Sequence, residues 1–313
     1  MSTTTATASP PATINATPPR QRGYWGNVGY RLRYDPVTLL FGTVLLLIIL
    51  CAIFAPLIAP FDPYQESIIR RLKPPGYRGH ILGTGFNRLH GLRQRIALDQ
   101  LGRDVLSRIL YGGRITLTMG ILPVMVATLI GGGLGVLAGF AGGLINALIM
   151  RVMDVFYAFP SVLLAVAISG AMGGGAVNGM IALSLVFIPP LCRVAETATT
   201  QVRNLDFVDA AKATGAPLRL VLWHHVLGNV LGPVLIYASS LVSVSIILAS
   251  GLSFLGLGVT PPEPDWGLML NALRQAIYVS PLVAAMPGIA ILITSISMNM
   301  VSDGLRSAMD VRS

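Results

Sequence analysis

Long apolar runs, nearly free of charge, decide what this sequence can fold into. The first covers residues 38–59 and can cross a bilayer, which takes about 20 residues in a helix. Five more follow, at residues 115–140, 150–170, 176–192, 226–250 and 283–302. The runs predict an all-α membrane protein with six transmembrane helices.

Composition supports this class. Of the 313 residues, 53% are hydrophobic and 11% are charged, whereas an ordinary soluble domain has about 25% charged residues. A soluble multidomain enzyme is therefore excluded. The net charge of +9 indicates basic loops beside lipid rather than nucleic acid binding, because the arginines flank apolar runs. Cys51 and Cys192 both lie in apolar stretches, so they predict no disulfide framework.

Six spans place both termini on one side of the membrane. The arginines at 20–33 beside the first span favour the cytoplasm under the positive-inside rule. The equally basic loop before the second span contradicts this, although long loops cross despite their charge. We expect five regions: a disordered basic cytoplasmic tail (1–36), a first helix (37–60), an extracytoplasmic loop (61–114), a core of five helices (115–305) and a cytoplasmic C-terminal tail (306–313).

The loop at 193–225, between the fourth and fifth spans, is polar at its start. A helix fits residues 204–214, with Asn204 or Asp206 as the cap at its start and Gly215 and Pro217 at its end. Its side chains are small, which lets another protein approach the backbone closely. The alternative is a connecting helix on the membrane surface, for which Leu205 and Phe207 are the apolar anchors. Periodicity alone leaves both open.

Residues 209–215 followed by 225–229 resemble the EAA loop of bacterial ABC importer permeases. Other segments resemble, in the same order, the C-type permease of the dipeptide, oligopeptide and nickel transporter family. These segments are residues 99–108, 151–154 with 159–160, 252–258, 261–267 and 303–306. The resemblance covers nearly everything after the N-terminal tail.

The resemblance implies a type I importer permease with a cytoplasmic coupling helix between spans four and five, in the bacterial inner membrane. It implies four kinds of partner: a homologous B-type permease, two cytoplasmic ATPases, an extracytoplasmic substrate-binding protein and the lipid bilayer. ATP and Mg would bind the ATPases, so this chain would carry no cofactor, metal or catalytic residue. Peptides are the expected cargo, with nickel and glutathione as alternatives.

The resemblance also assigns residues to two roles. The contact with the ATPase would be made by Asp209, Ala210, Ala211, Ala213, Gly215 and His225. Structural motif positions would be Gly102, Arg103, Asp104, Arg151, Asp154, Pro160, Trp266, Asp303 and Arg306. Substrate-lining residues are not predicted.

Three positions depart from the family pattern. Asp209 replaces the usual loop glutamate, and Gly228 replaces a proline. Residues 85–98 form an insertion with Leu89, Leu92 and Ile96 at helical spacing. A tolerated loop decoration is favoured over a basic amphipathic helix.

Some residues have more than one interpretation. Gly131, Gly135 and Gly139 predict a stripe where a neighbouring helix packs closely. Asp154 and Asp303 are expected to form ion pairs with Arg151 and Arg306 rather than a proton relay. Glu263, Asp265 and Trp266 would either touch a binding protein or anchor their loop.

Two functions of other classes are disfavoured. An ion-coupled secondary transporter would need charged or unwound sites at the membrane midplane, and the span interiors here are almost free of charge. A membrane enzyme would need a pair of catalytic groups, and the sequence offers none.

Overall fold

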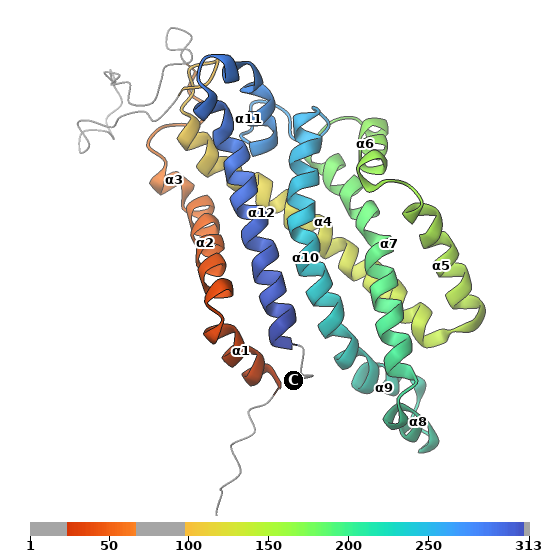
Figure 1. The fold of residues 1–313 in the computed structure, drawn as a ribbon. Helices are drawn as coiled ribbons and strands as arrows, with labels where there is room; N and C mark the ends of the chain where they lie inside the picture. The colour runs from red at the N-terminus through yellow and green to blue at the C-terminus, as the bar shows by residue number, and fades with distance from the viewer. Residues whose placement is uncertain (1–23, 67–97, 310–313) are drawn as a thin grey trace, which may run out of the picture.

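The computed structural model describes residues 24–66 and 98–309, whose regular secondary structure is helical (Figure 1). The predicted insertion, apart from Leu98, and the outer parts of both tails lie outside these residues. The helical elements toward the two ends of the described chain are α1 (Tyr24–Tyr34), α2 (Pro36–Ile53), α3 (Ala55–Ile58), α11 (Trp266–Ala272), the 3₁₀ turn η4 (Arg274–Tyr278) and α12 (Pro281–Met309). The central elements are α4 (Val105–Ala141), α5 (Gly143–Tyr157), α6 (Ser161–Met172), α7 (Ala176–Arg203), α8 (Asp206–Ala213), α9 (Leu218–Val221), the π-helical turn η3 (Leu222–Val226) and α10 (Leu227–Phe254).

Five helical stretches in the described residues are long and apolar enough to cross a membrane. They are α2, α4, α7, α12 and the continuous stretch from α9 to α10. The predicted third span is not a single helix, because α5 and α6 meet at an angle of 87°. Pro160 explains the break: it lacks an N–H for the helix and disfavours helical geometry in the residue before it. Counted as one bent span, the pair brings the number to six.

The second span starts ten residues earlier than its predicted boundary at 115. Asp104 caps α4 by accepting a hydrogen bond from the Ser107 backbone N–H at 2.8 Å. The charged side chains in this first part do not end the helix, because they have hydrogen-bond partners. Arg114, for example, donates to the carbonyl oxygens of Ala52 and Ile53, at the end of α2 where helical carbonyls lack partners.

The N-terminal tail is shorter than predicted, since residues 24–34 form α1 and not disordered chain. This helix packs against α12, a contact that the local sequence does not reveal. Figure 1 shows that α1, α8 and the C-terminus lie at one end of the bundle, called here the α8 end. The opposite end carries α3, α6 and α11 and is called the α11 end.

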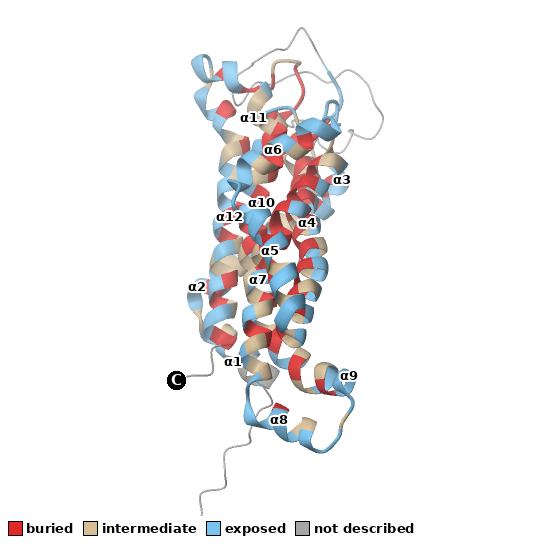
Figure 2. Ribbon diagram, turned by 90° about the vertical axis from the view of Figure 1, so that its right-hand side faces the viewer, coloured by how far each residue is buried: buried red, intermediate tan, exposed pale blue. Residues whose placement is uncertain are grey.

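The predicted glycine stripe packs directly against α7. A Cβ atom added to Gly131, Gly135 or Gly139 would lie 2.5, 2.2 or 2.7 Å from a carbonyl oxygen of α7. These oxygens belong to Ile188, Cys192 and Glu196, which follow the same four-residue spacing. The close-packing prediction is therefore confirmed. Buried residues run along the middle of the bundle, and most of α8 is exposed (Figure 2).

Candidate functional site

The predicted helix between the fourth and fifth spans exists and projects from the bundle as α8 (Figures 1 and 2). Its residues are Asp206–Ala213, close to the predicted 204–214. The predicted side-chain cap is wrong: Leu205 occupies the cap position and no side chain bonds there. Asp206 instead lies in the first turn, where its negative charge interacts favourably with the helix dipole and stabilises the helix. Gly215 ends the segment as predicted, with a φ of +78° that favours glycine.

Buried side chains fix this helix to the rest of the loop. Val208 of α8, Val221 of α9 and Val226 of η3 are all completely buried. The rings of Phe207 and His225 also meet, with centroids 6.2 Å apart. The segment from α8 to η3 is therefore packed together, and η3 continues directly into α10. The predicted loop at 193–225 begins later, because α7 extends to Arg203.

Much of the outer surface of α8 carries small side chains, as the sequence predicted, but Phe207 of this helix is exposed as well. Ala210, Ala213 and Gly215 are exposed, Ala211 and His225 are half-buried, and Asp209 is exposed. Asp209 forms an ion pair with Lys212 at 2.9 Å. Larger apolar side chains are exposed nearby, namely Leu205, Phe207, Leu218, Leu220 and Trp223. Trp223, which is 68% exposed, was not among the predicted anchors.

At the α11 end, the motif at 99–104 forms a compact turn. Both oxygens of Asp99 are used: Oδ2 accepts from Arg103 Nε at 2.7 Å, and Oδ1 accepts from the backbone N–H of Arg103 at 2.9 Å. Gly102 has a φ of +72°, so a side chain there would be strained. Gly102 and Arg103 thus shape this turn, and Asp104 caps α4.

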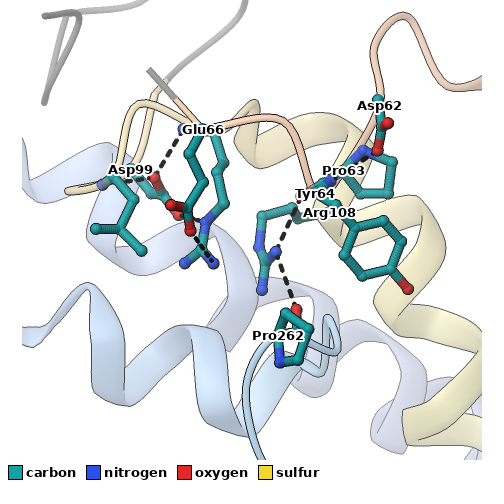
Figure 3. A network of polar contacts seen from close by, with 9 residues as sticks. Asp62, Pro63, Tyr64, Glu66, Asp99, Arg108 and Pro262 are labelled. Carbon is teal, nitrogen blue, oxygen red and sulfur yellow. Dashed lines mark hydrogen bonds and ion pairs between the residues drawn. The ribbon is translucent and has the colours of Figure 1, made fainter. Parts of the chain in front are cut away.

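Arg108 joins two loops that are distant in the sequence. Its Nη1 donates to the carbonyl oxygen of Pro63 at 3.0 Å and to that of Pro262 at 3.5 Å (Figure 3). Close by, the Tyr64 hydroxyl donates to Glu263 at 2.9 Å. Burial, together with Glu263, raises the pKa of Tyr64. This network holds the surface of the α11 end in one arrangement.

Asp265 and Trp266 anchor α11 to α4. They are only 1% and 3% exposed, which argues against direct contact with a binding protein. Asp265 caps α11 by accepting from Leu268 N, and it accepts a second bond from Thr116 at 2.7 Å. Burial raises the pKa of Asp265, against the opposing effect of these bonds. Trp266 donates from Nε1 to the carbonyl oxygen of Ile109 at 2.8 Å.

The prediction that Asp154 and Asp303 form ion pairs with Arg151 and Arg306 is wrong. Asp154 pairs with Arg193 of α7 and not with Arg151 of its own helix. Asp303 and Arg306 are both exposed and form no ion pair with each other. An exposed pair gains little free energy in water, whereas packing of α5 on α7 brings Arg193 to Asp154.

A groove that was not predicted lies beside this ion pair, with Arg193 in its lining. It has a volume of about 400 Å³ and lies between the end of α5, α7 and α10. Its lining includes Tyr157, Arg193, Thr197, Gln201 and Tyr237. The four-residue spacing of Arg193, Thr197 and Gln201 was the available signal, because it puts three polar side chains on one helical face.

Comparison with known proteins gives two matching family models. Residues 131–312 match the binding-protein-dependent transport system inner membrane component. Residues 23–75 match the N-terminal TM domain of oligopeptide transport permease C.

Two curated relatives cover most of the chain. The di/tripeptide transport system permease protein DppC of Pseudomonas aeruginosa is 39% identical over 268 residues, 85% of each chain. The glutathione transport system permease protein GsiD of Pectobacterium atrosepticum is 36% identical over 286 residues, 91% of this chain and 90% of the relative. Among solved structures, a chain of the inward-facing MetNI methionine ABC transporter superposes with a TM-score of 0.53 at 15% identity. That superposition covers 64% of this chain and 96% of the other, and it shows a shared fold.

Proposed function

Because this chain belongs to the binding-protein-dependent transport system inner membrane component family, as a permease of ABC transporters of the dipeptide/oligopeptide kind, we propose that it forms one half of a peptide path driven by separate ATPase subunits. A homologous B-type permease supplies the other half, and an extracytoplasmic binding protein delivers the peptide. ATP and Mg bind the ATPases. In this arrangement the α8 end faces the cytoplasm of the bacterium, and both termini lie there.

The structure of α8 is the observation that carries this proposal. A helix with exposed Ala210 and Ala213 offers a close backbone approach to a partner's groove. Val208 is completely buried, α8 packs against α9, and Phe207 meets His225 of η3, which leads into α10. A movement of a docked ATPase would therefore reach the spans. ATP can shift the permease only if α8 contacts the ATPase differently in the two states of the transporter.

The docking role is tested by adding bulk to the exposed face of α8. Ala210→Trp and Ala213→Trp are expected to lower ATP-dependent peptide uptake in proteoliposomes at least tenfold, because the indole blocks the close approach. Membrane insertion should be unchanged. Ala211 is less suitable because it is half-buried, and Gly215 because its positive φ would strain any side chain.

Ser307→Trp is the matched control, because Ser307 is exposed near the end of α12 at the same end of the bundle. Its uptake should match the wild type. Normal uptake by both the Ala210→Trp and the Ala213→Trp variants would contradict docking at α8. Uptake that persists without any ATPase, driven by an ion gradient, would instead indicate a secondary transporter.

Peptides are the proposed cargo because relatives named for di/tripeptides and for glutathione both align along most of the chain. Glutathione is itself a tripeptide. Competition between a labelled dipeptide, glutathione and Ni²⁺ for uptake by the complete transporter tests this choice. Inhibition by dipeptides alone is expected, and transport of Ni²⁺ without peptide transport would overturn the proposal.

A further inference from the structure

The ion pair between Arg193 and Asp154 is unusual for a membrane-embedded part of a chain. Both side chains are partly open, with 46% and 48% of their surface exposed. Arg193 lies ten residues before Arg203, where α7 ends. At about 1.5 Å per residue, this is about 15 Å along the helix from its end, within reach of the hydrocarbon core.

This pair does not suit a lipid-facing surface. Charged groups at membrane depth are costly in lipid and face a protein interior or a water-filled cavity. Many other exposed side chains on the spans are large and apolar, as on α5 with Leu144 and Leu148, or α12 with Leu292, although the charged Arg151 of α5 is exposed as well. The groove around Arg193 differs because Thr197 and Gln201 continue the polar face toward the α8 end.

Arg193 is also held in place by its surroundings. Its guanidinium lies over the ring of Tyr157, 4.9 Å from the centroid, and bonds to Asp154 on one side. Tyr237 of α10 lines the opposite part of the groove. A guanidinium presents several N–H donors, so its pairing with one Asp154 oxygen leaves donors available to a second carboxylate.

We propose that this groove is a contact point on the peptide path, where Arg193 binds the C-terminal carboxylate of the passing peptide. The proposal rests on the peptide permease function proposed above. Asp154 competes with the peptide for Arg193 and keeps the binding weak. Weak binding is what a path requires, because the cargo must leave as readily as it enters.

The first test measures peptide binding at the groove without the binding protein. Thr197→Cys, one helical turn from Arg193, is introduced into the purified transporter with Cys51 and Cys192 replaced by alanine. A dipeptide is expected to protect this thiol from alkylation, whereas the same dipeptide with a C-terminal amide should protect it at least tenfold less well. Adding Arg193→Gln should raise the dipeptide concentration for half-protection about tenfold, the effect of one lost charged hydrogen bond.

Asp154→Asn separates substrate contact from a structural role. It breaks the same ion pair but keeps Arg193, so dipeptide protection should persist or strengthen. If Arg193→Gln and Asp154→Asn weakened protection equally for both peptides, the pair would be a structural tie and the proposal would be wrong. Equal protection by the dipeptide and its amide in the parent Thr197→Cys transporter would also overturn it.

Uptake gives an independent readout. Arg193→Gln should reduce ATP-dependent dipeptide uptake about tenfold, with the B-type permease still co-purifying. Loss of that subunit would place the groove in the interface between permeases and overturn the proposal. Failure of the peptide function itself looks different: the wild type would then take up no dipeptide, whatever residue occupies position 193.

Discussion

The absence of a side chain at Gly135 allows two spans, α4 and α7, to pack closely together. A Cβ atom at this position would lie 2.2 Å from the carbonyl oxygen of Cys192, on the backbone of α7. A backbone oxygen inside a helix cannot turn aside as a flexible side chain can. Close helix approach through small residues is a main source of association in lipid, where the hydrophobic effect no longer drives helices together.

Gly135→Ala is therefore expected to destabilise the bundle by about 1–3 kcal/mol, the usual cost of overpacking. Gly133→Ala is the matched control on the same helix, because an added Cβ there meets no atom within 4 Å. Both changes alter helix propensity equally, so their difference isolates the contact between α4 and α7. Thermal unfolding in detergent should show a lower midpoint for Gly135→Ala only, and equal midpoints would contradict the close contact.

At the scale of elements, α8 depends on its neighbours for its position. It has eight residues, too few for a stable isolated helix in water, which needs about 12–15. Val208, the completely buried residue of α8, is the side chain placed to supply this stability, and α8 packs against α9 and α7. The small side chains that suit a docking surface bury little apolar area themselves. The stability of α8 therefore depends mainly on Val208.

Val208→Ala should cost about 1–2 kcal/mol of local stability through the lost methyl groups and the space they leave. Backbone amides of α8 should then exchange with deuterium about tenfold faster, and less peptide should be transported for each ATP hydrolysed. Val177→Ala makes the same change at an exposed position of α7 and should alter neither quantity. Unchanged exchange in Val208→Ala would show that other contacts hold α8.

At the scale of the whole molecule, the described chain has two different ends. The α11 end is tied together by Arg108, Asp265 and Trp266, which join two loops distant in the sequence to α4. The α8 end carries the projecting helix, together with α1 and the end of α12. Under the proposed function, the α11 end receives cargo from outside, and the ATPase acts on α8 at the other end.

This orientation predicts which side of the membrane each end meets. Cysteines are introduced in place of Glu263 at the α11 end and Ser307 at the α8 end, both exposed positions. A membrane-impermeant maleimide should label position 263 in intact spheroplasts and position 307 only in inside-out vesicles. Detergent-solubilised protein, in which both should react, is the control. Labelling of position 307 in intact spheroplasts would reverse the proposed topology.

Features that depend on local chemistry could be predicted from the amino-acid sequence. The apolar runs, the glycine stripe and the helix end at Gly215 follow from what lipid and a single helix require, so no knowledge of distant neighbours was needed. The start of α4, the burial of Asp265 and the partner of Asp154 depend instead on how distant parts of the chain pack. Arg193 lies 39 residues from Asp154, and Thr116 lies 149 from Asp265. A charged residue near an apolar run can end a helix or be included in it, depending on whether its side chain has a partner. Such partners come close only when distant helices pack together.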